Sequence, residues 1–353
     1  MRVVMLVLDG LPHRHVTAER MPRLHAIAMA DGHGFAAGEG VLASATYPNH
    51  ATFVTGVGPD VHGLTGNWVD RGGRLQAAQD VGAAGPTLFD AAARAGVTTA
   101  AVFGDQNLIG VTGARAATTH WPPGGVLPDD GETGIDGYNA DPATVRQLAD
   151  AIAGDADLVI AQLNDSDSAG HAFGPDSDEA RDAYAVVDAT FAAVVEQLRP
   201  RWDDTVLLAV SDHDQVPAAG GDGIDLWSPL RAAGLALTIV PEGDAAIITG
   251  DDPTDGAWLD EVAGVVGHRS WCGGRLAWAA PGHCFGYGEV LLRGVHGGLA
   301  TTTQVAIAAG GHPAVPAIAR SMERRRPHGR DWAPTIATLL DLPMPAATGR
   351  SLA

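Results

Sequence analysis

The chain has 353 residues, of which 46% are hydrophobic and 18% are charged, a composition typical of a globular protein with a large core. Its 42 acidic residues outnumber 22 basic ones and give a formal charge of −20, which disfavours polymeric nucleic acid and anionic membranes as partners. All the basic residues are Arg, so Schiff-base and P-loop chemistry, which depend on Lys, are excluded.

Short aliphatic runs alternate with helical patterns up to residue 210. The first run, residues 2–8, is strand-like, and a helical pattern over residues 20–30 follows it. The further expected elements are helices at 86–95 and 177–198 and strands at 97–103, 157–163 and 205–210. This order predicts an α/β fold with a doubly wound, mostly parallel sheet and helices on both faces.

The first strand-like run also bears on location. Val3–Leu8 is too short, and has too few residues before it, to be a signal peptide or a membrane span. We therefore expect a cytoplasmic protein that does not associate with membranes.

Residues 215–292 break the alternation with Gly-rich turns and short strand-like pieces such as Leu235–Val240 and Ala245–Thr249. We expect a small α+β cap here, inserted between two segments, 1–214 and 293–353, of one catalytic domain. The cap holds four Trp residues, which fit its core better than a stacking platform for a base: Trp227, Trp258, Trp271 and Trp278.

Cysteine usage excludes one kind of metal module. Cys272 and Cys284 are the only cysteines, so a four-Cys zinc site cannot form, and a single bridge between them stays open.

Carboxylate and imidazole side chains follow three of the predicted strands. Asp9 closes the first strand, Asp167 and His171 follow the next-to-last, and Asp212 and His213 follow the last. Each alone could be an ordinary loop residue. Together, at the carboxyl ends of neighbouring strands, they predict a metal site with the oxygen and imidazole ligands that suit zinc.

The segment Ala45–His50 precedes an apolar helical stretch that ends at Thr55. Pro48 fits the first turn of a helix, which places Thr46 at or just before the positive helix end, where a phosphate is favoured. Thr46 could equally be only the N-cap residue, a role that would not exclude catalysis.

Taken in order, these motifs resemble the alkaline phosphatase superfamily, and within it the nucleotide pyrophosphatase/phosphodiesterase branch, also called type I phosphodiesterases. The resemblance rests on Leu8-Asp9-Gly10, Thr46-Tyr47-Pro48-Asn49-His50, Asp167-Ser168-Ala169-Gly170-His171, Ser211-Asp212-His213, His296-Gly297-Gly298 and Ala333-Pro334-Thr335. It spans nearly the whole chain except the cap. It implies an alkaline phosphatase-like catalytic domain formed by residues 1–214 and 293–353.

The resemblance also implies two divalent metal ions. The implied ligand sets are Asp9, Thr46, Asp212 and His213 for one ion and Asp167, His171 and His296 for the other. Mixed Asp and His ligation favours zinc, although manganese or iron would satisfy similar ligands. His296 is assigned by the resemblance alone, and Asp167 is preferred to Asp165 because its offset from His171 matches the family motif. Asn67 resembles the family's donor to a phosphate oxygen.

Such a site implies a metal-dependent hydrolase for phosphodiester or pyrophosphate bonds of a small, nucleotide-like substrate. Thr46 would attack phosphorus and form a phosphothreonine intermediate, which water would then hydrolyse. A neutral donor such as Asn67 suits a diester better than the more highly charged monoester.

Several alternatives remain within and beyond the superfamily. A phosphonate hydrolase, a phosphomonoesterase or a phosphomutase would share the metal ligands, although the phosphonoacetate type uses Lys residues that this chain lacks. A sulfatase is disfavoured because Thr46 stands where it would need Cys or Ser. A non-catalytic metal-binding protein would be favoured by Ala at Thr46 or at a ligand, and neither occurs. The natural substrate, the role of His283 and the oligomeric state stay open.

Overall fold

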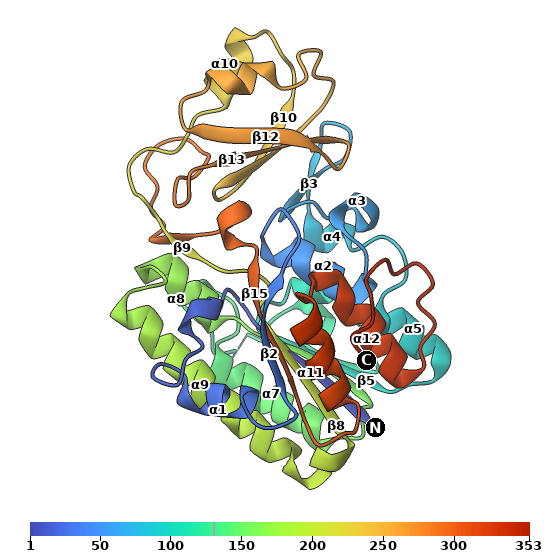
Figure 1. Cartoon of the computed structure of the whole chain (residues 1–353). Helices are drawn as coiled ribbons and strands as arrows, with labels where there is room; N and C mark the ends of the chain where they lie inside the picture. Colours follow the sequence, from blue (N-terminus) through green and yellow to red (C-terminus); the bar gives the residue numbers. More distant parts are fainter. Residues whose placement is uncertain (130) are drawn as a thin grey trace.

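The computed structural model describes residues 1–129 and 131–353, and a seven-stranded sheet lies at its centre (Figure 1). The strands, in sheet order, are β2 (Gly34–Glu39), β15 (Thr303–Ala309), β8 (Thr205–Val210), β1 (Arg2–Leu8), β7 (Leu158–Leu163), β5 (Thr99–Phe103) and β6 (Thr119–Trp121). From β8 to β6 all neighbours are parallel, whereas β15 runs antiparallel to both β8 and β2. The predicted α/β class is confirmed.

Helices cover both faces of the sheet because alternate side chains of each buried strand point to opposite sides. In β1, Met5 belongs to the core on one face and Leu6 to the core on the other. The helices on the first face are α2 (Thr46–Thr55), α5 (Leu88–Ala95), α6 (Leu108–Val111), α11 (Val315–Arg324) and α12 (Trp332–Leu340). Those on the second are α1 (Pro22–Ala28), α7 (Asp141–Ala153), α8 (Asp165–Phe173) and α9 (Asp178–Leu198).

Local sequence explains where these helices start and stop. At α5, the Thr87 side chain and the Asp90 side chain cap each other's backbone N–H groups, and Gly96 ends the helix in the left-handed conformation. The helix predicted at 86–95 therefore forms from its own end signals, and the one predicted at 177–198 appears as α9.

A second lobe rises above the sheet in Figure 1. It contains α10 (Trp227–Ala232) and an antiparallel sheet of β10 (Thr238–Glu242), β11 (Ala245–Thr249), β13 (Gly274–Ala279) and β12 (Val265–Trp271). The chain leaves through β9 (Val216–Pro217) and returns through β14 (Gly294–Val295), and these two strands pair antiparallel. On this ground we propose that the inserted cap is 215–292 and that 1–214 and 293–353 form the catalytic domain.

Two of the Trp residues pack within this lobe. Trp258 is buried in its core, and Trp227 stacks on Tyr287 with ring centroids 4.6 Å apart. Cys272 and Cys284 are both free, so the bridge that the sequence left open does not form.

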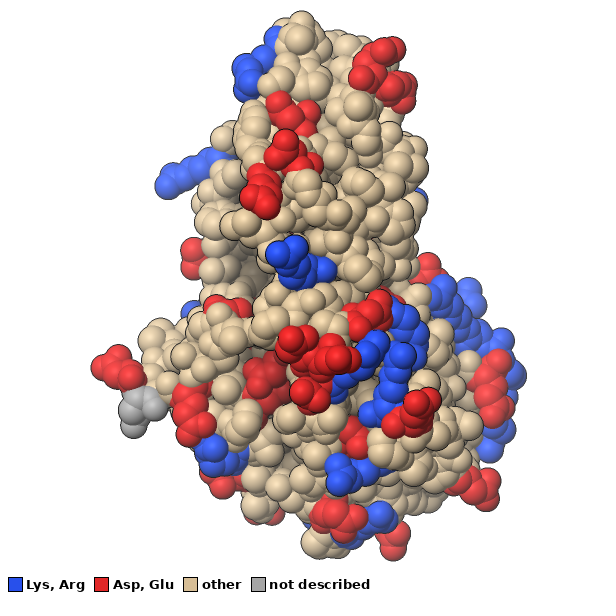
Figure 2. Space-filling view, turned by 90° about the vertical axis from the view of Figure 1, so that its left-hand side faces the viewer, with Lys and Arg blue, Asp and Glu red and all other residues tan. Residues whose placement is uncertain are grey.

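Short elements link α2 to α5 beneath the upper lobe: α3 (Pro59–His62), β3 (Trp68–Asp70), β4 (Leu75–Ala77) and α4 (Ala78–Val81). Acidic and basic side chains are interspersed over the lower lobe on the face seen in Figure 2. Among residues 1–129 and 131–353, none of the helices combines the length and the apolarity that a bilayer span requires.

Candidate functional site

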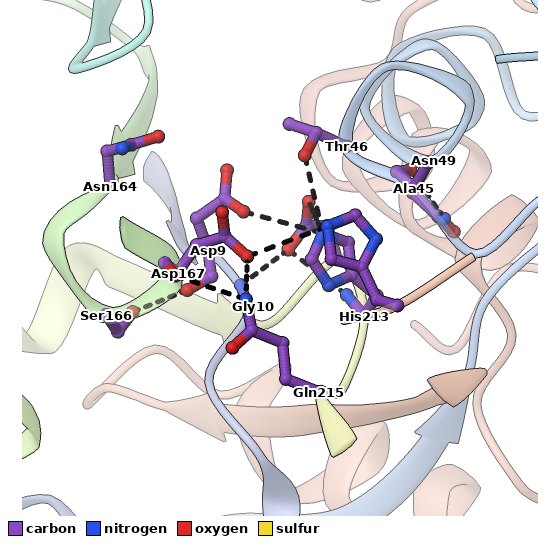
Figure 3. A network of polar contacts seen from close by, with 12 residues as sticks. Asp9, Gly10, Ala45, Thr46, Asn49, Asn164, Ser166, Asp167, His213 and Gln215 are labelled. Atoms are coloured by element: carbon purple, nitrogen blue, oxygen red, sulfur yellow. Dashed lines mark hydrogen bonds and ion pairs between the residues drawn. The ribbon is translucent and has the colours of Figure 1, made fainter. Parts of the chain in front are cut away.

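The predicted chemistry-bearing residues gather at one edge of the large sheet. β1, β7 and β8 are adjacent and parallel, so the residues that follow them meet at their shared carboxyl ends. Asp9 follows β1, Asp167 lies in the first turn of α8 directly after β7, and His213 follows β8. Figure 3 shows these side chains and that of Thr46 converging from different elements.

One part of the cluster surrounds the imidazole of His213. Its Nε2 lies 3.6 Å from Asp9 Oδ1 and 3.4 Å from Asp212 Oδ2. Thr46 Oγ1 lies 3.3 Å from the same nitrogen. Asp9, Asp212 and His213 each offer one ligand atom within 4.8 Å of the other two. This spacing fits a single cation among them.

The other part contains His171, His296 and Asp167. The Nε2 atoms of the two histidines lie 3.1 Å apart, and Asp167 Oδ2 lies 3.3 Å from His171 Nε2. Backbone carbonyls hold the opposite nitrogens, since His171 Nδ1 donates to Gly294 O and His296 Nδ1 donates to Ser44 O. Both rings thus present Nε2 to the cluster.

His213 lies between the two parts. Its ring stacks on that of His296 with centroids 3.7 Å apart, and it falls within 4.8 Å of ligand atoms from both Asp167 and His296. All seven residues predicted as metal contacts therefore lie together, while their division between two ions remains a proposal.

Thr46 is the first residue of α2, as Pro48 in the first turn predicts. The N-cap is Ala45, and no side chain makes a cap hydrogen bond. The interpretation of Thr46 as merely an N-cap is therefore wrong. Its hydroxyl faces His213 at the positive end of the helix.

Burial controls the protonation of the cluster. It raises the pKa of the Asp9 carboxyl well above the ordinary value, and repulsion from Asp212 adds to this. Burial also lowers the pKa of His213 to about 4 and that of His296 to about 3, so both imidazoles are neutral at pH 7. Among the described residues, Asp9 Oδ1 and Asp212 Oδ2 are buried without a hydrogen-bond partner. Neutral imidazoles and unpartnered carboxylate oxygens fit divalent cations.

Three supporting residues escaped the sequence reasoning. Gln162 Nε2 donates to Asp9 Oδ2 over 2.7 Å, Gln215 Nε2 donates to the Asp167 carboxylate, and His50 Nδ1 donates to Thr46 O over 2.9 Å. Gln162 left a signal, because a polar residue inside the buried run Leu158–Leu163 needs a partner. His50 follows Thr46 at the spacing of one helical turn.

A cavity of about 350 Å³ opens beside Thr46. Its lining residues are Thr46, Tyr47, Asn67, Asp105, Ile135, Asp136, Tyr138, Asn164, Asp167, Ser168, His171, Ala172, Leu291, Leu292 and His296. Oδ1 of Asn67 is buried there without a partner among the described residues. The competing carboxylate Asp165 instead accepts a hydrogen bond from Asp141 N, and His283 is exposed in the upper lobe, outside this lining.

Sequence comparison relates most of the chain to known hydrolases. Residues 3–264 match the family model described as Type I phosphodiesterase / nucleotide pyrophosphatase. Over 191 residues the chain is 30% identical to an uncharacterised pyrophosphatase/phosphodiesterase of Schizosaccharomyces pombe. That match covers 50% of this chain and 37% of the relative, so it spans little more than a third of the relative's length.

Solved structures share the fold. Murine ectonucleotide pyrophosphatase / phosphodiesterase 5 matches with a TM-score of 0.74 at 18% identity, over 99% of this chain and 97% of that one. An inactive threonine-to-alanine form of the same protein, in complex with AMP, matches with a TM-score of 0.73 at 18% identity and the same coverage of 99% and 97%. Phosphonoacetate hydrolase from Sinorhizobium meliloti, in complex with phosphonoformate, matches with a TM-score of 0.67 at 19% identity over 94% of each chain.

Proposed function

Because the chain belongs to the type I phosphodiesterase/nucleotide pyrophosphatase family of hydrolases, we propose that it cleaves phosphodiester or pyrophosphate bonds of a small, nucleotide-like substrate. One observation carries this proposal. The hydroxyl of Thr46 lies at the start of α2, 3.3 Å from His213 Nε2, and borders a cavity large enough for a small ester. We assign Thr46 as the nucleophile.

The residues of the cluster fit two divalent ions, and their ligand chemistry favours zinc. The proposed ligand sets are Asp9, Thr46, Asp212 and His213 for one ion and Asp167, His171 and His296 for the other. When bound, the ions lower the pKa of the Thr46 hydroxyl and neutralise charge on the phosphoryl oxygens.

The proposed reaction has two displacements at phosphorus. Thr46 Oγ1 forms a bond to phosphorus while the ester bond opposite to it breaks. The leaving oxygen takes the electron pair, and the proton lost from the Thr46 hydroxyl passes through solvent to this oxygen. The phosphothreonine is then attacked by water, the P–Oγ1 bond breaks, and the Thr46 hydroxyl is regenerated. Asn67 donates a hydrogen bond to a non-bridging oxygen in both steps, which stabilises the charge that develops there.

Two observations bear on the substrate. The AMP complex of the murine relative supports a nucleotide-like ligand, and the charge of −20 disfavours a nucleic-acid polymer. The cavity lining among the described residues contains no Arg, so the phosphate group would be bound by the metal cluster and Asn67.

A phosphonate hydrolase is the second candidate, because the phosphonoacetate hydrolase shares the fold. The cavity holds Asp105 and Asp136 but, in the part of the chain that is described, no Arg to receive a substrate carboxylate. That lining favours the phosphodiester.

The test combines elemental metal analysis with hydrolysis of bis-p-nitrophenyl phosphate and p-nitrophenyl phosphate. We expect about two zinc ions per chain, faster turnover of the diester, and an inactive Thr46→Ala variant. Thr338→Ala, which removes an exposed hydroxyl on α12, is the matched control and keeps full activity. Absence of metal, or activity that survives Thr46→Ala, would sink the proposal.

A further inference from the structure

One turn of the upper lobe packs against the candidate site. Residues 243 and 244 join β10 to β11. Glu242, the last residue of β10, is only 7% exposed, and its Oε1 accepts a hydrogen bond from the backbone N–H of Asn67 over 2.6 Å. A carboxylate of the upper lobe thus binds the peptide group of a residue that lines the cavity beside Thr46.

The loop that carries Asn67 passes so close to Glu242 that position 66 has no room for a residue larger than glycine. A Cβ atom on Gly66 would lie 2.3 Å from Glu242 Oε1 and 2.9 Å from Ile247 Cδ1. Glycine at this position therefore permits the close approach of the loop to the carboxylate.

The same turn also abuts the loop of His296. A Cβ on Gly297 would lie 1.8 Å from Glu242 O, and one on Gly243 would lie 1.8 Å from His296 O. The backbone N–H of Asp244 donates to His296 O over 3.3 Å. One turn therefore packs against two walls of the cavity, those of Asn67 and His296.

Glu242 is an acidic residue at a buried position, and such a residue needs a compensating interaction. Burying a charge is unfavourable, and no ion pair involving Glu242 is found among the described residues. Burial raises the pKa of Glu242 to about 7, so the group is partly ionised at neutral pH, and its ionised form accepts a stronger hydrogen bond from the Asn67 N–H than a neutral acceptor would. Glu242 can therefore hold the Asn67 peptide in place more rigidly than packing alone would.

We propose that Glu242 is a positioning residue that fixes Asn67 so that its amide reaches the phosphoryl oxygen, which makes the upper lobe part of the catalytic apparatus. This inference rests on the proposed role of Asn67. It predicts that the contribution of Glu242 to turnover passes through Asn67 and disappears when the Asn67 amide is removed.

The test is a double-mutant cycle on the full chain with bis-p-nitrophenyl phosphate. The variants are Glu242→Ala, Asn67→Ala and the double variant, with zinc content and unfolding temperature measured for each. We expect Glu242→Ala to lower kcat by roughly 10- to 100-fold, part of what a lost oxyanion donor costs, with KM and zinc content nearly unchanged. In the Asn67→Ala background the same change should alter kcat by less than about 3-fold.

Glu242→Gln separates positioning from loss of folding, because the amide oxygen still accepts the Asn67 N–H in a side chain of the same size. We expect it to restore kcat to within about 5-fold of the wild type. Gly66→Ala approaches the contact from the other side and should lower kcat while leaving zinc bound. Asp244→Asn is the matched control. Asp244 lies in the turn that follows Glu242, but its carboxylate accepts a hydrogen bond from Gly298 N and not from Asn67. The effect of Asp244→Asn on kcat should add to that of Asn67→Ala.

Additive effects of Glu242→Ala and Asn67→Ala would overturn the inference, as would a loss of turnover explained by lost zinc. A fully active Asn67→Ala would also overturn the inference. If Thr46→Ala were inactive in the same experiment, the proposed hydrolase function would still be supported. An active Thr46→Ala would instead remove the proposed function itself.

Discussion

Thr46 Oγ1 lies 3.3 Å from His213 Nε2, although 167 positions separate the two residues in the chain. Thr46 starts a helix on one face of the sheet, and His213 follows a central strand. The contact joins the positive end of α2 to the carboxyl edge of the sheet. Since Ala45 is the N-cap, the Thr46 hydroxyl has no part in starting the helix.

This arrangement predicts that Thr46→Ala separates activity from stability. Turnover of a diester should fall by about 10⁴-fold or more because the nucleophile is lost. The free energy of unfolding of the metal-free protein should change by less than about 0.5 kcal/mol, since no cap is removed. Thr46→Ser keeps a hydroxyl and should retain measurable turnover. Steady-state kinetics and urea unfolding check both, and a large loss of stability in Thr46→Ala would contradict the geometry.

Metal removal should cost both activity and stability. Without cations, the buried Asp9 and Asp212 carboxylates repel each other, and burial together with this repulsion raises the pKa of Asp9. A chelator should therefore abolish turnover and lower the unfolding temperature, and Zn²⁺ should restore both. At roughly 100 times its dissociation constant, free metal stabilises the fold by about 2.7 kcal/mol.

Asp212→Asn sharpens this prediction. The variant should bind metal poorly, yet its metal-free form should unfold at a higher temperature than the metal-free wild type, because a buried charge is removed. Asp182→Asn, an exposed change on α9, serves as the control. If the metal-free wild type proves the more stable, the repulsion among these carboxylates is not the cause of its instability.

His62 should give the protein an acid-sensitive contact. The ring is buried, its Nδ1 accepts from Leu64 N over 3.2 Å, and its Nε2 lies 3.0 Å from Thr52 Oγ1 on α2. A neutral ring with its proton on Nε2 satisfies both contacts. Burial lowers the pKa of His62 from 6.5 to about 4.

Protonation of His62 is therefore less favourable in the folded state than in the unfolded state. The free energy of unfolding is therefore highest above pH 6.5, and it decreases by up to about 3 kcal/mol as the pH falls towards 4. His62→Gln should flatten this part of a plot of unfolding free energy against pH. The exposed His283→Gln is the control, and equal slopes for His62→Gln and the wild type would refute the assignment.

Gly297 should tolerate no side chain. Its φ is +130°, and an added Cβ would lie 1.8 Å from Glu242 O. Gly297→Ala should displace the neighbouring His296, reduce the metal content and lower the free energy of unfolding by about 3 kcal/mol.

Gly72 is the matched control for this change. Its φ is +69°, and a Cβ there would meet nothing within 4 Å, so Gly72→Ala should cost only about 1 kcal/mol of backbone strain and leave the metal bound. Equal losses for the two variants would mean that backbone conformation, and not the contact with Glu242, decides the outcome.

Much of the fold could be predicted from local pattern. Strands β1, β7 and β8 are buried on both sides, so their sequences are nearly continuous aliphatic runs. β2 and β6 gave no such signal, because Gly34–Glu39 contains four Gly or Ala residues and only one large apolar side chain, and Thr119–Trp121 is a short edge strand. The β-strand propensity of a sequence is a weak signal where the strand has little apolar surface to bury.

For the site, the sequence alone determined which residue types end the central strands and that Thr46 begins a helix. The parallel pairing of β1, β7 and β8 then brings Asp9, Asp167 and Asp212 to one edge. These features depend on short-range periodicity and on a general rule of α/β sheets. His296 was reached only by resemblance, since nothing in its neighbourhood predicts a ligand.

Only the tertiary structure decided the partners that hold the site in place. Glu242 meets Asn67 across 175 positions, and Gln215 meets Asp167 across 48. Such contacts depend on how the two lobes and their loops pack, and no periodicity along the chain encodes the distance between segments that only packing brings together.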